Sequence, residues 1–295
     1  KRNYHRVDND IEADDTGQTL AFTDTWTWND CASAGLEEIV GNASSRFQPQ
    51  TIELIKGLHP FLGQSSLLAY LVSITLRINE IQRVLASRGS FYLHCDPTAS
   101  HYLKLLLDAV FCAQGGEFVN EIIWSYKTGG ASKRHFSRKH DVIFLYSKGK
   151  DWTFNPQKEK SYMMHKYGFK KSNFQIDKEN DLQYSMVYSR DVLEIPTIGS
   201  DSSERLGYPT QKPEALLQRL ILASSNEGDV VLDAYCGCGT ALAVAHALKR
   251  QWIGIDITTQ SIAAILKRFE TKFSGQDILS TIRVSGIPSN QILSS

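Results

Sequence analysis

The stretch Asp229-Val-Val-Leu-Asp-Ala-Tyr-Cys-Gly-Cys-Gly-Thr240 decides the fold. A short β-branched, apolar run is followed by two glycines and then by the segment Ala241–Arg250, which predicts a strand, a tight turn and a helix. Glycine lets the backbone approach a ligand closely, and the first turn of the helix leaves N–H groups free to bind it. The pattern therefore predicts a nucleotide-like ligand at this turn.

A second strand that ends in an acid follows the helix, in Trp252-Ile-Gly-Ile-Asp256. In a doubly wound sheet a carboxylate at that place accepts hydrogen bonds from two ribose hydroxyls. The dinucleotide fingerprint is a rival interpretation, but its third glycine would fall on Leu242. A ligand without a pyrophosphate is therefore favoured. A bare tight turn without a ligand is the other alternative, and the acids and the tyrosine near the glycines argue against it.

Upstream of this region, Tyr208-Pro-Thr-Gln-Lys-Pro213 precedes an amphipathic segment. Pro213 suits the first turn of a helix. The apolar positions that would share one face are Leu216, Leu217, Leu220 and Ile221.

The N-terminal half alternates between helical and extended patterns. Helical spacing begins at Ser65 and Ser66, which suit an N-cap, and a second helix is predicted from Tyr102 to Phe111. Strands are predicted at Phe91–Asp96, Glu121–Tyr126 and Asp141–Tyr146, and a weak one at Thr281–Val284. Strands that alternate with helices imply an α/β fold with a doubly wound, mostly parallel sheet.

The charges are unevenly placed, although their sum is zero. Eight lysines and three acids lie between Lys148 and Lys178, interleaved with aromatic residues, and a second basic loop runs from Lys127 to Lys139 around two glycines. Both segments suit contacts with DNA phosphates, and the alternative is a solvated surface. The candidate DNA-binding residues are Lys127, Lys133, Arg134, Arg138, Lys139, Lys166, Lys170 and Lys171.

Composition excludes several classes of protein. No apolar run is long enough to span a bilayer and the start is not a signal peptide, so we expect a cytoplasmic protein without membrane contact. The five cysteines are odd in number and scattered, which indicates reduced thiols. The spacing of the histidines fits no metal site, and we expect His94, His135 and His140 to be structural or to contact phosphate.

Two segments carry a resemblance to a known family. Tyr208–Ile257 resembles the joined motifs X, I and II of bacterial DNA amino-methyltransferases of the permuted beta arrangement, and Leu67–Lys148 is similar to their motifs V to VIII. The resemblance implies S-adenosylmethionine as the cofactor. Its expected ligands are Gln211, Lys212, Asp233, Tyr235, Gly237, Gly239 and Asp256, with Tyr235 in place of the usual Phe.

The same resemblance implies a domain order. We expect a target-base half in residues 1–148, a target-recognition insert in 149–205 and the cofactor-binding half in 206–295. The tryptophans of Asp24–Asn29 either lie near the entry of the base or cover the edge of the core.

The family's catalytic motif, Asp-Pro-Pro-Tyr or Asp-Pro-Pro-Phe, is not in this sequence. Asp96-Pro-Thr-Ala99 lacks the second proline and the aromatic residue, so we interpret Asp96 as a supporting acid in a turn at the end of a strand. Lys1-Arg-Asn-Tyr4 resembles the family's continuation of the motif. We therefore expect the motif to end shortly before Lys1, and this chain to lack the first strand of its half and to be inactive alone.

The function that the resemblance implies is methyl transfer to the exocyclic amine of a flipped base in a specific duplex sequence. Adenine N6 is favoured by resemblance, and cytosine N4 is the alternative. A non-catalytic DNA-binding protein is a second hypothesis, and a methyltransferase for RNA or protein is a third. Double-stranded DNA is the expected partner, with a cognate restriction endonuclease and a homodimer left open.

Overall fold

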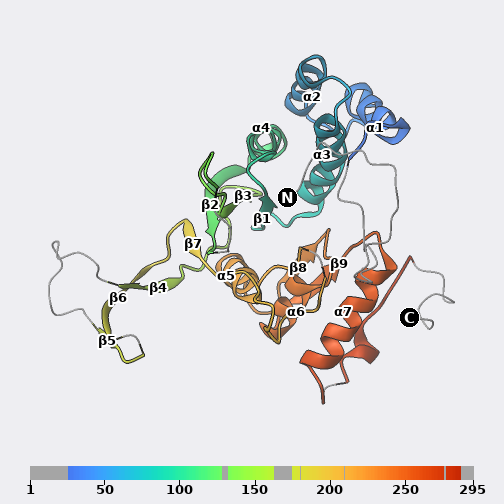
Figure 1. The fold of residues 1–295 in the computed structure, drawn as a ribbon. Helices are drawn as coiled ribbons and strands as arrows, with labels where there is room; N and C mark the ends of the chain where they lie inside the picture. The colour runs from blue at the N-terminus through green and yellow to red at the C-terminus, as the bar shows by residue number, and fades with distance from the viewer. Residues whose placement is uncertain are drawn as a thin grey trace.

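We describe a computed structural model of the chain (Figure 1) over residues 26–127, 132–162, 175–179, 181–208, 210–275 and 277–286. The α-helices are α1 (Asp30–Gly41), α2 (Pro49–Leu62), α3 (Ser66–Val84), α4 (Ser100–Phe111), α5 (Glu214–Ser224), α6 (Thr240–Ala247) and α7 (Thr259–Lys272). The strands are β1 (Ser90–Cys95), β2 (Glu117–Ser125), β3 (His140–Ser147), β4 (Lys158–Tyr162), β5 (Gln175–Asp177), β6 (Leu182–Tyr188), β7 (Val192–Glu194), β8 (Val230–Asp233) and β9 (Gln251–Gly254).

The larger sheet has the strand order β1-β3-β2-β7. β3 is antiparallel to both of its neighbours, while β2 and β7 are parallel, so β1, β2 and β7 run in one direction and β3 alone is reversed. The helix α4 carries the chain from β1 back to β2, but the described residues between β2 and β3 contain no helix, and such a connection gives an antiparallel pair. The α/β class is confirmed, and β3 is the exception to the predicted parallel direction.

The smaller sheet pairs β8 with β9 in parallel, with α6 as the crossover. This is the predicted strand, turn, helix and strand. The prediction of a further strand at Thr281–Val284 was wrong, because a 3₁₀ turn occupies Leu279–Thr281 and the residues after it do not pair with a strand. The Ile282 side chain packs instead into the cluster around α6 and α7.

α5 joins the two sheets. Leu216 and Leu220 pack with Ile122 of the larger sheet, while Ile221 packs with Val244 of α6. Burial of such apolar side chains is the main favourable term in folding. The sequence correctly predicted this face of the helix, which fixes the cofactor-side sheet against the other half of the fold.

The N-terminal helices α1 and α2 pack against α3, whose N-cap is Ser65 as predicted. The Trp28 ring stacks on His59 at 6.0 Å between centroids, and Trp26 lies 5.5 Å from Tyr70. Of the two interpretations of these tryptophans, the structure supports the one in which they cover the edge of the core.

The strands β4, β5 and β6 form a small antiparallel sheet that stands apart from the body (Figure 1). It lies within the predicted insert 149–205, but β7 of the same range pairs with β2 in the main sheet. The sheet that stands apart therefore contains fewer residues than the predicted insert 149–205, because β7 belongs to the larger sheet. Its one buried acid, among the described residues, is Asp177, which accepts hydrogen bonds from Lys160 and Tyr162.

Candidate cofactor and DNA site

The turn between β8 and α6 needs both of its predicted glycines. Gly237 and Gly239 have φ of 49° and 70°, in the left-handed region that favours glycine. A Cβ on Gly239 would lie 2.7 Å from Cγ1 of Ile265, and one on Gly237 would lie 3.1 Å from Cε1 of Tyr208. The turn therefore packs closely against Ile265 of α7 and against Tyr208.

Asp256, two residues after the end of β9, accepts hydrogen bonds from this turn and from the start of α7. Its Oδ2 accepts a hydrogen bond from the Gly237 N–H at 2.9 Å. Its Oδ1 accepts from the Thr258 N–H at 3.1 Å, the Thr258 hydroxyl at 3.2 Å and the Ser261 hydroxyl at 2.7 Å. A carboxylate has about four acceptor positions. Two of these positions belong to each oxygen, so Oδ2, which accepts one hydrogen bond, has room for one further donor.

The hydroxyl of Tyr208 extends the same network, since it lies 2.9 Å from Oγ of Ser261. Burial raises the pKa of Tyr208, so it stays protonated. The network ties the segment before α5, the start of α7 and the glycine turn into one unit.

Asp233, at the end of β8, lies beside the same turn. Its Oδ1 accepts the Tyr235 N–H at 3.1 Å. Burial raises the pKa of Asp233, and the negative charge of Asp256 raises it further, against the opposing effects of the Tyr235 N–H and the Lys212 charge. The repulsion between the carboxylates of Asp233 and Asp256 makes this site locally negative, and a negative site favours a cation. The Tyr235 side chain, 54 % exposed, presents an aromatic ring at its surface.

Lys212 lies between the two halves of the fold. Its positive charge opposes the rise in the pKa of Asp233 on β8 and contributes to the lowered pKa of Asp141 on β3. Its Nζ donates to the Thr210 carbonyl at 2.8 Å. The charge of this predicted cofactor residue therefore acts on one acid of each sheet.

Gln211 has a different environment from its neighbour. Its Oε1 accepts the Leu206 N–H at 2.9 Å, and its Nε2 donates to the Glu204 carbonyl at 2.6 Å. Both ends of the side-chain amide are therefore used to close the loop before α5. These two bonds hold the Gln211 side chain in the loop, and its contact with the cofactor stays a prediction.

Sequence reasoning missed Arg268 on α7, whose side chain is only 4 % exposed. Its guanidinium donates to the Cys238 carbonyl at 2.8 Å and to the Thr240 hydroxyl at 3.2 Å, and it pairs with Glu214 of α5 at 3.3 Å. It joins the glycine turn to two helices. The only signal in the sequence was an arginine among the apolar positions of an amphipathic helix.

On the base side, His94 of β1 and Asp141 of β3 form a pair, with 2.9 Å between Nε2 and Oδ2. Burial acts to raise the pKa of Asp141, but the His94 hydrogen bond and charge, with Lys212 and the Tyr126 hydroxyl, outweigh it and lower the pKa. This agrees with the structural role expected for His94.

Asp96 forms a turn at the end of β1. Its Oδ1 accepts the N–H groups of Thr98 and Ala99 at 3.0 and 3.3 Å, immediately before α4. An Asp side chain that bonds to the backbone two residues on forms a local turn, which here precedes the first helical residue, Ser100. It matches the interpretation of Asp96 as a supporting acid.

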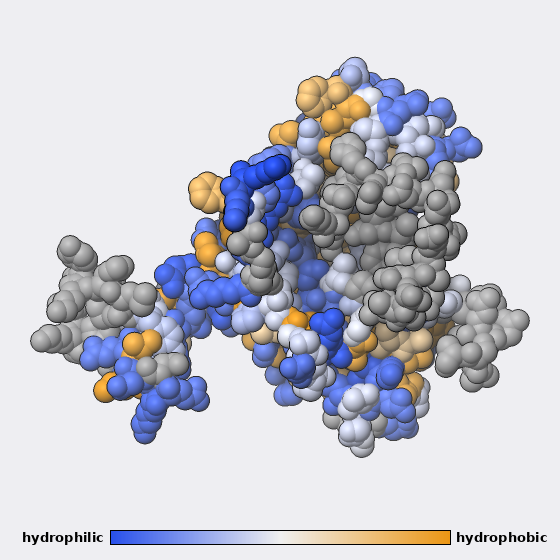
Figure 2. Space-filling view, in the orientation of Figure 1, coloured by the Kyte–Doolittle hydropathy of each residue, from blue (hydrophilic) through white to orange (hydrophobic). Residues whose placement is uncertain are grey.

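The predicted DNA-binding residues divide into two groups. Lys127, Lys133, Arg134 and Arg138 are exposed and Lys139 is half-buried, all in the loop between β2 and β3. Lys166, Lys170 and Lys171 lie outside the described residues. Hydrophilic residues cover much of the body in the face seen in Figure 2, while the projecting β4–β6 sheet shows both hydrophilic and hydrophobic residues.

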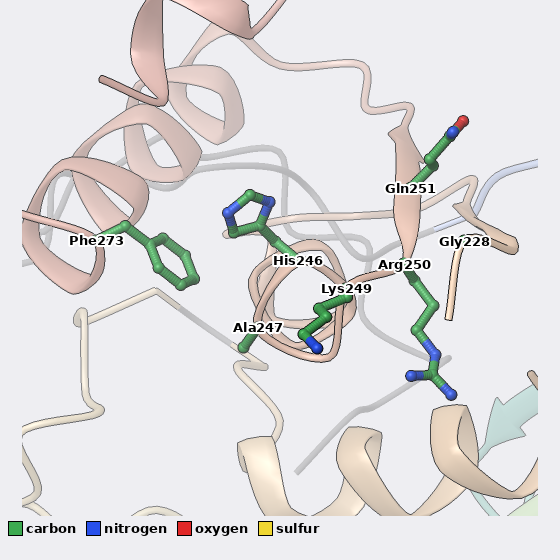
Figure 3. A pocket seen from close by; sticks show the side chains of 7 residues that line it. All are labelled: Gly228, His246, Ala247, Lys249, Arg250, Gln251 and Phe273. Carbon is green, nitrogen blue, oxygen red and sulfur yellow. The ribbon is translucent and has the colours of Figure 1, made fainter. Parts of the chain in front are cut away.

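Two hollows in the described part of the chain lie away from this site. Figure 3 shows one of about 650 Å³ between the end of α6 and the start of β9, with His246 and Phe273 on one side and Arg250 on the other. It is at the opposite end of β8 and β9 from Asp233 and Asp256. The other, of about 520 Å³, lies between the larger sheet, α5 and the residues around Tyr188.

Comparison with known proteins now gives the class. The family model described as DNA methylase, for N6 and N4 methyltransferases, matches residues 61–267, which include both sheets and all of the site residues above except Arg268. The chain belongs to this family.

Two curated relatives are similar in sequence. The type II methyltransferase M.HpaI of Haemophilus parainfluenzae is 34 % identical over 207 residues, covering 68 % of this chain and 59 % of the relative. The DNA adenine methyltransferase YhdJ of Escherichia coli K12 is 33 % identical over 196 residues, covering 65 % and 64 %. The chain spans about three-fifths of the length of these relatives.

Solved structures show more distant similarity. The M1.HpyAVI–SAM complex has a TM-score of 0.48 at 19 % identity, with 76 % of this chain and 97 % of that chain covered. The cytosine-N4-specific PvuII DNA methyltransferase has a TM-score of 0.48 at 17 % identity, with 69 % and 70 % covered. No described helix has the length and apolar character required to cross a membrane.

Proposed function

We propose that this chain provides the methyl-donor site and a DNA-contacting surface of a DNA methyltransferase that acts on an exocyclic amine, adenine N6 in particular. The donor is S-adenosylmethionine. The observation that carries the proposal is the group of charges around one glycine turn: Asp256 bonded to the Gly237 N–H and Asp233 bonded to the Tyr235 N–H, with the Lys212 charge acting on Asp233.

The charges of the site fit the charges of the donor. S-adenosylmethionine carries a sulfonium and an α-ammonium, which the acidic side of the site attracts, and a carboxylate, which Lys212 attracts. The exposed ring of Tyr235 would offer the sulfonium a face for a cation–π contact. When bound, the donor supplies an electrophilic methyl group, and these residues hold and orient it.

Asp256 fits the ribose in a more limited way than the sequence predicted. Three donors already occupy Oδ1 and one occupies Oδ2, which leaves an acceptor position for one ribose hydroxyl instead of two. The same hydrogen bonds hold the carboxylate in place before the ligand arrives. We therefore assign Asp256 one ribose contact and the support of the turn.

Adenine is the proposed target base because the relative YhdJ is named as a DNA adenine methyltransferase. Duplex DNA is the proposed partner, and the exposed cations of the β2–β3 loop supply the attraction to phosphate. A restriction endonuclease is a further proposed partner, since M.HpaI is named a type II methyltransferase.

The sequence contains no Asp-Pro-Pro-aromatic segment that would accept the amine protons and stack on the extruded base. Asp96 does not replace it, because its Oδ1 is used in the turn before α4. We propose that the 295-residue chain binds the donor and DNA without transferring the methyl group.

The test uses S-adenosylmethionine with a tritium-labelled methyl group, the full chain and a mixed-sequence plasmid. Filter retention measures donor binding, and label in the purified DNA measures transfer. We expect retention of donor and unlabelled DNA. No retention would contradict the donor site, while labelled DNA would contradict the inactivity, and its digestion to nucleosides would show adenine or cytosine as the target.

A further inference from the structure

Phe136 is exposed to an unusual extent. Its side chain is fully solvent-exposed, at 100 %, in the loop between β2 and β3. A phenylalanine ring gains free energy when it leaves water, so a ring presented in this way is suited to a partner that buries it.

The loop around this ring is held in place by its own hydrogen bonds. The Tyr126 N–H donates to the Lys139 carbonyl at 3.0 Å and closes the base of the loop. Oγ of Ser132 accepts the N–H groups of Arg134 and His135 at 3.2 and 3.3 Å. The ring therefore projects from a local turn with defined bonding.

The charge around the ring selects the kind of partner. Lys133, Arg134 and Arg138 are exposed, and they form no ion pair with any other described residue. The sequence from Lys127 to His140 contains no acid. An exposed aromatic ring among cations fits a ligand that has both phosphates and stacked bases, which is a nucleic acid.

The position of the loop links it to the methyl-donor site. β2 ends and β3 begins at the same edge of the sheet where β1 ends, because Cys95 pairs with Val142 and Ser125 pairs with His140. The charge of Lys212, one of the proposed donor-site residues, contributes to the lowered pKa of Asp141 near the start of β3. The ring thus projects from the edge at which a target base would be presented.

We propose that Phe136 is a wedge that inserts into the base stack of duplex DNA and fills the space left by the extruded base. The inference rests on the proposed function. Apolar side chains inserted between base steps offset part of the cost of unstacking, and extrusion of a base leaves a gap of that kind. The neighbouring cations hold the backbone while the ring occupies the gap.

The experiment compares two short fluorescein-labelled duplexes of the same mixed sequence, one intact and one with a single abasic position. Fluorescence anisotropy measures the binding of the full chain and of the variants Phe136→Ala and Phe136→Trp. Phe61→Ala is the matched control, because Phe61 is also largely exposed, at 74 %, but lies on α2. Thermal unfolding checks that all variants remain folded.

We expect the parent to prefer the duplex with the abasic position. Phe136→Ala should bind that duplex about tenfold more weakly, as for the loss of one base–aromatic stack. Phe136→Trp and Phe61→Ala should keep the preference. Equal affinity of the parent and Phe136→Ala for the abasic duplex would overturn the wedge. An equal loss of affinity for the abasic and the intact duplex in Phe136→Ala would also overturn it. A parent that binds neither duplex overturns the DNA part of the proposed function as well, and the ring then belongs to a surface for another partner.

Discussion

Nε of Arg268 donates to the Cys238 carbonyl at 2.8 Å, and this one contact joins α7 to the turn that forms the methyl-donor site. The guanidinium is almost fully buried, and it also pairs with Glu214 of α5. The glycine turn thus depends on a residue 30 positions away in the sequence.

Substitution of Arg268 by Ala should therefore destabilise the fold strongly. It removes the buried donors to the Cys238 carbonyl and the Thr240 hydroxyl, and a buried acceptor left unpaired costs about 1–3 kcal/mol, while Glu214 keeps its ion pair with Lys272. Urea denaturation measures the loss, with Lys267→Ala as the control, because Lys267 is exposed on the same helix. A loss as small as that of the control would show that the guanidinium does not support the turn.

The substitution Gly239→Ala should destabilise the protein by about 1–2 kcal/mol, from the left-handed backbone alone, and by more through the contact with Ile265. The matched control is Gly57→Ala within α2, where nothing lies within 4 Å of the added Cβ. That change should stabilise the helix by about 0.5–1 kcal/mol. Chemical denaturation of both variants tests the opposite signs, and the same sign for both would contradict the geometry.

Asp141 should make stability depend on pH on the acidic side. Its pKa is lowered in the folded chain, so its contribution is complete above the unfolded value of about 3.9 and is lost as pH falls through the folded pKa. As pH falls below about 3.9, the urea midpoint should therefore decline less for Asp141→Asn than for the parent. Asp201→Asn, at an exposed position, should keep the parent's slope. Identical slopes for the parent and Asp141→Asn would contradict the His94 pairing.

Salt dependence should identify the cations that contact phosphate. Single changes of Lys133, Arg134 or Arg138 to Ala should weaken binding to any duplex and reduce the log–log salt slope by about 1 each. Lys56→Ala on α2 should leave the slope unchanged, because Lys56 pairs with Glu53 away from the loop. Anisotropy titrations at several salt concentrations measure these slopes. An unchanged slope in all three loop variants would remove this loop from the DNA interface.

The sequence predicted the elements whose signals are local. The run before Gly237 and the helix face with Leu216 were correct because a strand, a glycine turn and an amphipathic face each have a short-range pattern. The α/β class followed from the alternation of these elements.

The rest depends on contacts between distant residues. β3 is reversed because the loop before it returns without a helix in its described part, which periodicity does not report. Arg268 was missed because its partners lie on α5 and in the β8–α6 turn. The bonding of Gln211 and Asp256 likewise appears only once the loop before α5 and the start of α7 are placed.

The most direct test of the account is isothermal titration calorimetry of the full chain with S-adenosylmethionine. We expect one saturable site per chain, with affinity reduced about tenfold or more in Asp233→Asn, as for the loss of one hydrogen bond to a charged group. The side-chain oxygen of Asn can still accept the Tyr235 N–H, so the turn remains folded, and Asp201→Asn is the control. No heat of binding from the parent, or equal affinity in Asp233→Asn, would contradict the proposed methyl-donor site.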